Sequence, residues 1–570
     1  MKKYDVKIMP LGGQDEMGKS MYAVDIDEKL FIIDAGFRFP DSDKLGVDTI
    51  IPSFDWLKDN QKRISAIIIT HGHEDVMGAL PYILREMPGL PVYAPSLTAN
   101  IMEEQIARYE RHRKVDCKLN LIRVARDESI TIDGVPCEFF PLTHSIPGAV
   151  GVALWTRKGY VVYGSEFIID FGAPEGFRSD LQRMIDIGKK GVLALMMESS
   201  YARRSGYTAP KHKLTDLIRN EFEQATGRII ITSYARNIFR TLEIIELTKK
   251  YNRQIVFLDS HKYDQTNLIL KLDKESTHPV FHIEKKYIGK LENLGNARRD
   301  RNYVVLVSGK PDSIYSDISD ILDGGNEYLK IREDDTFIIA SPVLPGTEKI
   351  ATAVTNNVYR TPASHIKILK NKSLSSMHAS VEDIRVALQV FRPKYYIPIK
   401  GRYRDFIANA AVARDMGIKD KNIVILDNGE FAAFARGVLA KPEERSSMHI
   451  DVPDVMVDGI GIGDVGDKVI DDRVQLSNDG VVIVGVTIDK KTKKIVANTD
   501  CQTRGFVYVK EQKNIIRHVV ELCEAEVSRL QDKPDTDMKD IRGAMVKQSK
   551  NYIRKETGKD PMVICVVVEV

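Results

Sequence analysis

The chain has 570 residues, more than a single hydrophobic core supports, so we expect three or four domains. Its 43% hydrophobic and 29% charged residues are typical of an ordinary globular protein and exclude a disordered or fibrous one. The net charge of +3 does not by itself indicate a nucleic-acid partner. The five scattered cysteines include no CxxC pair and indicate neither a disulfide framework nor a cysteine zinc site.

Short apolar runs separated by turns predict buried strands in the first two hundred residues. The runs are rich in Ile and Val and read KLFIIDAG, ISAIIITHGH, PVYAP, GYVVYGSEF and GVLALMMESS. Helical patterns such as DVMGALPYILREM and SLTANIMEEQIARYERHR fall between them. This alternation predicts a layered α/β architecture.

The same alternation restarts at about residue 206 and predicts a second α/β unit that ends near residue 355. Its expected strands are GRIIITSYA, QIVFLDS, NYVVLVSG and DTFIIASPV. A helix, a strand and a helix follow, and the polar AKPEERSSMHIDVPD reads as a linker. Beyond it, GVVIVGVTID and KIVANTD predict a hairpin, and PMVICVVVEV predicts a buried strand.

Signals for a membrane or for secretion are not evident in the sequence. No stretch approaches 18 uninterrupted apolar residues, and Asp5 and Lys7 interrupt the first apolar run. We therefore expect a cytoplasmic protein without a membrane partner.

Polar residues that can hold a metal follow several of the predicted strands. THGHED supplies His71, His73 and Asp75, LTHSIPG supplies His144, and YGSEF supplies Glu166. Imidazoles combined with carboxylates suit zinc or manganese. Two histidines one residue apart are weak evidence alone, but three such loops at strand ends predict a metal site.

The order and spacing of these segments resemble the metallo-β-lactamase fold. Further motifs are PLGGQDEMGKSMYAVDIDEKLFIIDAGFRFP, ESSYARRSGYT, TSYARNIFR, SSMHAS, RPKYYIPIKGRYR and GIGDVGDKVIDDRVQLSNDGVVIV. Together all these segments are similar to the ribonuclease J family, the bacterial branch of the metallo-β-lactamase nucleases that carries an inserted β-CASP domain. The resemblance covers nearly the whole chain. It implies an α/β fold: an αββα metallo-β-lactamase sandwich, an inserted β-CASP α/β domain and a small C-terminal α/β domain.

The expected domain boundaries follow from the same resemblance. Residues 1–205 and 356–445 would form the metallo-β-lactamase domain, and residues 206–355 the β-CASP domain. Residues 446–460 would be a linker, and residues 461–570 a C-terminal α/β oligomerisation domain.

The family implies two metal ions bridged by a hydroxide that attacks an RNA phosphodiester. His71, His73 and His144 match ligands of the first metal, and Asp75 matches a ligand of the second. Glu166 stands where the family has a bridging aspartate. Asp75 is therefore both a metal ligand and a catalytic candidate.

Two positions depart from the family pattern at the second metal. Val76 and Lys400 each replace a histidine ligand, so we expect at most one ion, zinc or manganese. We hypothesise that the Lys400 ammonium lies near Asp75 and Glu166 and replaces the charge of the second metal. The alternative is that Lys400 points into solvent.

Other segments match residues that the family uses for catalysis and RNA contact. Glu198 matches a supporting carboxylate, and His378 matches a residue that can protonate the leaving oxygen. As bare sequence, a histidine in a serine-rich loop is more often a surface residue. The expected RNA-binding residues are Ser376, His378, Ser380, Arg236 and Arg240.

Three functions remain open at this stage. The first is an impaired ribonuclease J-type protein of RNA decay and of rRNA and mRNA maturation, which binds RNA and assembles with an active ribonuclease J paralogue. Alone it would form a homodimer or homotetramer. The second is an active 5′-3′ exoribonuclease and endoribonuclease with a one-metal or rearranged site. The third, a hydrolase of a small thioester or lactam, would need neither a β-CASP domain nor the GIGDVG segment.

Overall fold

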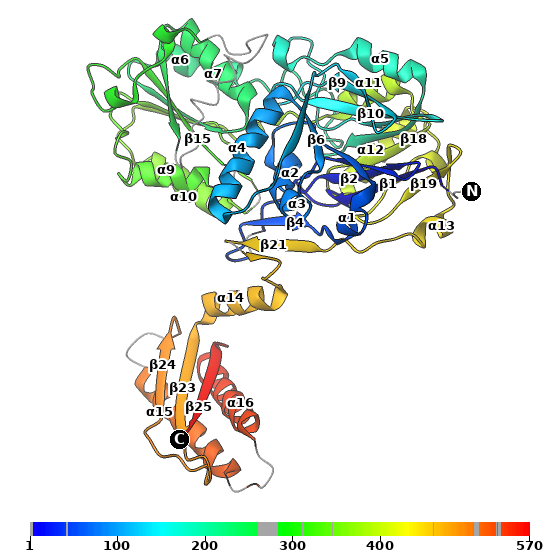
Figure 1. Cartoon of the computed structure of the whole chain (residues 1–570). Helices are drawn as coiled ribbons and strands as arrows, with labels where there is room; N and C mark the ends of the chain where they lie inside the picture. The colour runs from blue at the N-terminus through cyan, green and yellow to red at the C-terminus, as the bar shows by residue number, and fades with distance from the viewer. Residues whose placement is uncertain are drawn as a thin grey trace. The chain divides into compact units, whose positions relative to one another are not determined.

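The computed structural model describes residues 4–41, 44–259, 283–310, 313–344, 346–459, 461–506, 512–531, 533 and 537–570. The first of two compact units holds the described residues of Met1–Phe39 and Thr49–Val455, and the second holds those of Pro40–Asp48 and Met456–Val570. Figure 1 shows the helices and strands of each unit. Among the described residues, no helix combines the length and the apolar character needed to cross a membrane.

Two β-sheets lie at the centre of the first unit. The larger has the order β20-β19-β1-β2-β3-β5-β6-β7. Its strands are β1 (Val6–Gly12), β2 (Met21–Ile26), β3 (Lys29–Ile33), β5 (Ile64–Ile68), β6 (Pro91–Pro95), β7 (Asn120–Val124), β19 (Ala432–Ala435) and β20 (Val438–Leu439). The smaller has the order β18-β12-β11-β10-β9-β8, with β8 (Ser129–Ile132), β9 (Val135–Pro141), β10 (Val150–Thr156), β11 (Gly159–Tyr163), β12 (Val192–Glu198) and β18 (Tyr395–Ile399). Because β12 runs parallel to β11 and β18, the carboxyl ends of these strands meet at one edge.

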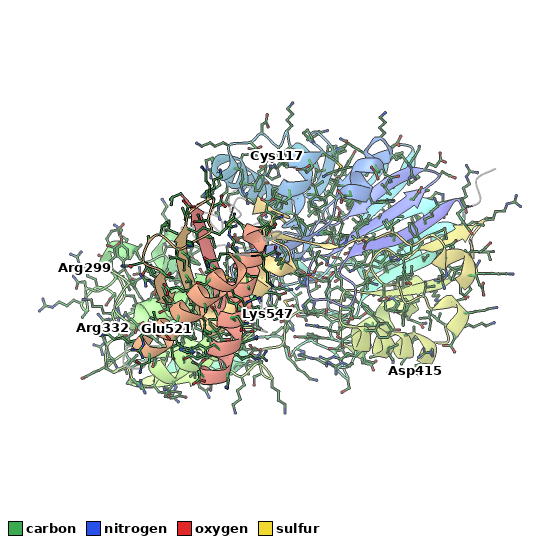
Figure 2. The ribbon with its side chains drawn as sticks, turned by 90° about the horizontal axis from the view of Figure 1, so that it is seen from below. Cys117, Arg299, Arg332, Asp415, Glu521 and Lys547 are labelled. Carbon is green, nitrogen blue, oxygen red and sulfur yellow. The ribbon has the colours of Figure 1, made fainter. Side chains whose placement is uncertain are left out.

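Helices accompany both sheets on their outer sides. With the larger sheet are α1 (Asp55–Asp59), α2 (Glu74–Met77), α3 (Leu80–Glu86) and α4 (Ser96–Arg113); with the smaller are α5 (Leu181–Lys190), α11 (Val381–Phe391) and α12 (Tyr403–Asp415). Helix α4 contacts β6 and β7, α5 contacts β11, and α12 contacts β18. Asp415, labelled in Figure 2, marks the C-terminal end of α12. The layers therefore follow the αββα order that the sequence predicts.

Short elements complete this part of the chain. They are β4 (Thr49–Pro52), α13 (Pro442–Ser446), and the 3₁₀ turns η1 (Gln61–Arg63), η2 (Glu175–Phe177) and η5 (Asp420–Asn422).

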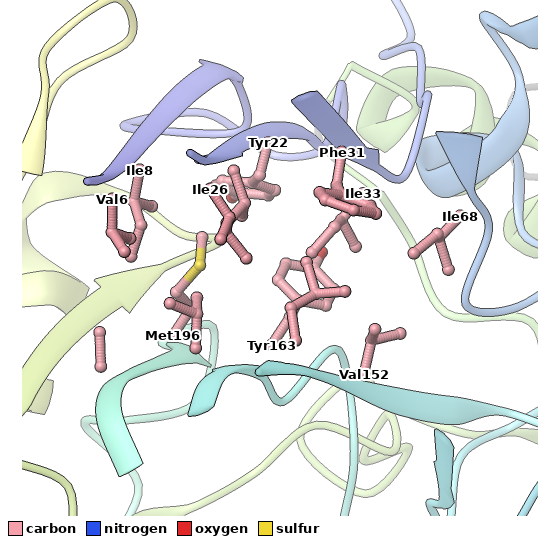
Figure 3. Packing of buried hydrophobic residues seen from close by; sticks show 14 of the residues in the cluster. Val6, Ile8, Tyr22, Ile26, Phe31, Ile33, Ile68, Val152, Tyr163 and Met196 are labelled. Carbon is pink, nitrogen blue, oxygen red and sulfur yellow. The ribbon is translucent and has the colours of Figure 1, made fainter. Parts of the chain in front are cut away.

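Side chains from the two sheets interdigitate to form the main core. Figure 3 shows Val6, Tyr22 and Phe31 of the larger sheet opposite Tyr163 and Met196 of the smaller one. All five are at most 2% exposed. Burying one Val, Phe or Met side chain contributes about 1.5–3 kcal/mol. This packing holds in place the strand ends from which the candidate site is built.

A third sheet is inserted in the sequence between β12 and α11. Its order is β14-β15-β13-β16-β17, and all its pairings are parallel. Figure 1 shows α6 and α7 on one side of it and α9 and α10 on the other. Its elements are α6 (Thr215–Gln224), β13 (Ile229–Tyr234), α7 (Ile238–Lys250), β14 (Gln254–Asp259), η3 (Lys285–Tyr287), η4 (Leu291–Asn293), β15 (Tyr303–Gly309), α9 (Ile314–Leu322), β16 (Thr336–Ile339), α10 (Glu348–Val358) and β17 (His365–Ile368).

The second unit contains a three-stranded sheet of order β24-β23-β25. The elements from the linker onward are β21 (Asp454–Asp458), β22 (Gly461–Ile462), α14 (Asp467–Asp479), β23 (Val481–Ile488), β24 (Asp500–Arg504), α15 (Gln512–Leu530), α16 (Met538–Thr557) and β25 (Met562–Glu569). The predicted hairpin partner of β23 was placed too early, because the antiparallel strand is β24 and Ile495 forms only an isolated bridge to Ile488.

The prediction of a fully buried last strand is also wrong. In β25 buried and exposed residues alternate, and Ile564, Val566 and Val568 are 42%, 42% and 48% exposed. A run of apolar residues does not reveal which face of a strand has a partner.

Candidate metal centre

The candidate centre lies where strands of the two sheets end, on backbone of unusual conformation. Asp34, Ser165 and Lys400 follow β3, β11 and β18, and their φ angles are 63°, 50° and 51°. Few residues other than glycine adopt positive φ, and such residues cluster at functional sites.

Three histidines from two loops form the centre, His71 and His73 from one and His144 from the other. The ring centroids of His71 and His73 are 4.8 Å apart, and His144 lies 4.9 Å from each. Glu166 Oε2 is 3.1 Å from His71 Nε2 and 3.3 Å from His144 Nε2. One potential ligand atom from each of these four residues lies within 4.8 Å of the others, which is a geometry that can hold a metal ion.

Neighbouring groups orient the imidazoles for metal binding. His144 Nδ1 lies 2.9 Å from the carbonyl oxygen of Met377, to which it can donate, and this leaves Nε2 free to accept. His71 Nδ1 lies 3.1 Å from Thr70 Oγ1, which donates to Asp34 Oδ1. His71 Nε2 is buried without a hydrogen-bond partner in the described part of the chain. A metal ion would satisfy this orphaned nitrogen, so the residues present fit one ion.

The protonation state of the histidines also favours binding of a metal ion. Burial lowers the pKa of His71 to about 3, although the Glu166 carboxylate opposes the shift. Burial also lowers the pKa of His73 well below its usual range. Both imidazoles are therefore neutral at physiological pH, which is the state that binds metal.

Lys400 lies on the side of Glu166 that faces away from the three histidines. Its Nζ lies 3.5 Å from Glu166 Oε1 and 3.7 Å from Asp34 Oδ2, and its side chain is 4% exposed. Burial alone would lower the pKa of Lys400, but the charges of Glu166, Asp34 and Asp75 outweigh it and raise the pKa. The ammonium is therefore a permanent charge, and the alternative that Lys400 points into solvent is wrong.

The Glu166 carboxylate lies between the histidines and this ammonium. Burial alone would raise its pKa, but the Lys400 charge and the adjacent His144 and His71 imidazoles hold it well below the usual range. One carboxylate oxygen thus faces the imidazoles and the other faces the lysine.

Asp34 is a site residue that the sequence analysis missed. Its side chain accepts hydrogen bonds from Thr70 Oγ1 at 2.9 Å and from Tyr163 Oη at 2.6 Å, and it is fully buried. The available signal was an aspartate directly after the buried run FII, the same pattern that marked the other loops. It is Asp34, not Asp75, that joins Glu166 in ion pairs with Lys400 among the described residues.

The second metal position lacks suitable ligands. Val76 is completely buried at the end of the short helix α2 and offers no donor atom. Among the described residues, Asp75 belongs neither to the group of four ligands above nor to a second group of potential ligands, Glu166, Glu198 and His378. Burial and the Glu166 charge raise the pKa of Asp75 to about 8, which the nearby Lys400 charge partly opposes. A second cation therefore does not fit beside the lysine ammonium.

A second acid-histidine pair lies beside the centre. His378 Nδ1 is 2.8 Å from Glu198 Oε2, and the other Glu198 oxygen accepts from the backbone N–H groups of Phe167 and Ala379. Burial opposes protonation of His378, but the Glu198 charge outweighs it and raises its pKa to about 10. The His378 ring centroid is 5.8 Å from that of His144. A protonated donor thus lies next to the candidate metal position.

The residues expected to contact RNA differ in how accessible they are. Arg236 lies beside the centre, with its carbonyl oxygen 3.4 Å from His73 Nε2 and its Nε 3.4 Å from Glu74 Oε1. Ser376 is half-buried, and its N–H donates to Tyr201 Oη.

Two of the residues expected to contact RNA are buried. Ser380 is buried, and its hydroxyl lies 2.7 Å from Thr208 Oγ1. Arg240 is 3% exposed, and it donates to the carbonyl oxygen of Ser375. In this conformation both side chains lie inside the protein, where their hydrogen bonds hold the serine-rich loop.

The layered fold with three histidines and an acid at its strand ends defines a metallo-β-lactamase-type protein. Residues 31–167 match the Beta-lactamase superfamily domain, 226–358 the Ribonuclease J beta-CASP domain, and 468–570 the Ribonuclease J C-terminal domain. The chain is 31% identical to "Ribonuclease J 2" of Streptococcus pyogenes serotype M3, over 99% of this chain and 100% of that protein. It is 30% identical to "Ribonuclease J 2" of Staphylococcus aureus (strain MRSA252), over 100% of this chain and 99% of that protein. The chain belongs to the ribonuclease J family.

Among solved structures, a protein of unknown function from Enterococcus faecalis V583 aligns with 75% of this chain and 100% of its own. The TM-score is 0.48 and the identity is 14%, too low to add to the assignment. The resemblance predicted from the motifs is confirmed by the family matches, as is the fold class. Family membership also disfavours a hydrolase of a small thioester or lactam.

Proposed function

We propose that this protein binds RNA and assembles with an active ribonuclease J paralogue in RNA decay and in rRNA and mRNA maturation, with weak or no nuclease activity of its own. The observation that carries the proposal is the Lys400 ammonium, 3.5 Å from Glu166 Oε1, on the side where the family has a second metal. A lysine there supplies positive charge but no Lewis acidity.

His71, His73, His144 and Glu166 would hold at most one zinc or manganese ion. When bound, such an ion would activate a water molecule and polarise a phosphoryl oxygen. The clamp on both the attacking and the leaving oxygen needs two ions, and Val76 and Lys400 remove the second. Low turnover follows from this loss, whichever ion is bound.

The second candidate function is a slow exoribonuclease and endoribonuclease with this one-metal site. The protonated His378 supports it, because a donor next to the metal position can protonate the leaving oxygen. Glu198 would keep His378 in the protonated form. Asp75 is the third catalytic candidate of this site.

RNA binding is expected beside the metal centre, at Arg236. Changing Arg236 to alanine should weaken binding of a single-stranded oligoribonucleotide and reduce the slope of log K against log salt by about 0.7, the effect of one phosphate contact. Fluorescence anisotropy at several salt concentrations measures both quantities.

The same RNA with a 5′-monophosphate, incubated with Mn²⁺, should stay largely intact unless an active paralogue is added. If the unaltered protein alone degraded the RNA rapidly, the second candidate function would replace the first.

Assembly is expected to involve the C-terminal domain, for which we propose residues 461–570. Its sheet buries one face and exposes Ile483, Ile564, Val566 and Val568 on the other, at 39%, 42%, 42% and 48%. Exposed apolar patches of this kind often mark protein interfaces.

Replacing Val566 with lysine should therefore abolish co-elution with the paralogue in size-exclusion chromatography. It should leave RNA binding by the first unit unchanged. Gly485 pairs with Val566 in the sheet and leaves room beside it, so a folded variant is expected. Co-elution of the variant equal to that of the unaltered protein would place the interface elsewhere.

A further inference from the structure

We propose a second RNA-binding site, a cationic cavity at the end of the smaller sheet opposite to the metal centre. The cavity has a volume of about 590 Å³. Arg392, Lys394, Lys419 and Lys421 lie among its lining residues, with Pro393, Met416 and Ile418. The inference rests on the proposed function, because it assigns a further surface to the same ligand class.

Charge is the first argument for an anionic ligand. No aspartate or glutamate is among the residues that line the cavity. Within the described part of the chain, no ion pair joins Arg392, Lys394, Lys419 or Lys421 to a carboxylate. The two arginines just outside the cavity are different, because Arg385 and Arg414 are both paired with acids. The four cations that remain unpaired are those that face the cavity.

The residues that line the cavity suit a single strand of RNA. Met416 and Ile418 are half-buried beside the lysines and offer apolar surface to a base, while the cations offer contacts to phosphates. Proteins that bind single strands combine a positively charged groove with side chains against which bases pack, most often aromatic ones.

Position separates this cavity from the metal centre. Tyr395 lines the cavity and begins β18, whereas Lys400 follows the last residue of the same strand. A strand of five residues spans roughly 16 Å. A long RNA bound at the centre would have to extend at least this far to reach the cavity, which would lengthen its contact with the protein.

A purely structural explanation accounts for two of the four cations. Arg392 is the C-cap of α11, where a cation stabilises the negative end of the helix dipole. Lys394 Nζ donates to the carbonyl oxygen of Gly437 at 2.6 Å. Lys419 and Lys421 lie beyond the last turn of α12, around η5, and make no such contact among the described residues. They are the residues on which the test depends.

The test compares two matched lysines. Lys421 is the central residue of the 3₁₀ turn η5, and Lys62 is the central residue of η1; both are exposed. We expect Lys421→Glu to weaken binding of a long single-stranded oligouridylate and to reduce its salt slope by about 0.7, while Lys62→Glu changes neither. The double variant Lys419→Glu/Lys421→Glu should roughly double the loss of slope. Circular dichroism confirms that each variant is folded.

Each result has a distinct meaning. If Lys421→Glu and Lys62→Glu both bind the RNA with the affinity of the unaltered protein, this inference is overturned and the proposed function stands. If the unaltered protein does not bind RNA, both fail. Competition by a free mononucleotide as effective as that by RNA would assign the cavity to a nucleotide and overturn the proposal as well.

Discussion

Replacing Val76 and Lys400 with histidine together is expected to create a centre that binds two metal ions and hydrolyses RNA. The double variant removes the ammonium that repels a second cation and supplies the two missing imidazoles. One carboxylate oxygen of Glu166 already faces His71, and the other faces the position of Lys400. We expect metal content to rise by one ion per chain and RNA hydrolysis to rise about 100-fold, the scale of one lost electrostatic contact in a transition state.

The matched control changes the same two positions without adding ligands. Val76→Leu with Lys400→Met should bind no additional metal. Because Val76 is completely buried, the larger histidine side chain is expected to cost about 1–3 kcal/mol, so folding is checked for both variants. A folded double-histidine variant that takes up no further metal would contradict the account of Lys400.

Replacing Lys400 with methionine alone is expected to destabilise the first unit by about 3–5 kcal/mol, because it leaves Glu166 and Asp34 buried without their cation. Denaturant unfolding followed by fluorescence measures the loss. The control is Lys58→Met, which breaks a surface pair with Glu86 at 3.2 Å and should cost at most about 1 kcal/mol.

The loss in free energy of unfolding caused by Lys400→Met should depend on pH. In the unaltered protein the pKa of Glu166 is held well below its usual 4.5, so its contribution to stability is present above that value and is lost as the pH falls. Without the lysine, its pKa rises and the carboxyl group can take up a proton. The difference between the two proteins should therefore be largest near neutral pH and shrink towards pH 4.5. An equal difference at all pH values would mean that the ammonium does not interact with these acids.

The sequence predicts the layers and the loops of the centre because both follow from local patterns. Short Ile- and Val-rich runs identify the strands, and a polar residue after each run identifies a loop at a strand end. His71, His144 and Glu166 could be found in this way. The substitution of Lys400 could also be noticed, because it interrupts a motif.

What the sequence did not predict depends on contacts between distant segments. Nothing local shows that Asp34 and Lys400, 366 positions apart, lie 3.7 Å from each other. The same holds for the serine-rich loop, where the burial of Ser380 depends on its contact with Thr208. The exposed face of β25 depends on which side α15 and α16 cover. Such partners are fixed by tertiary packing, not by the period of apolar residues.

Metal content of the unaltered protein tests the central claim most directly. The protein is purified without chelator or metal-affinity resin, loaded with Mn²⁺ or Zn²⁺, dialysed and analysed by mass spectrometry, with His73→Ala as the control for the first site. We predict at most one ion per chain, lost in His73→Ala, and little hydrolysis of 5′-monophosphorylated RNA. Two tightly held ions with rapid hydrolysis would contradict the assignment of Lys400 as the replacement for the second metal.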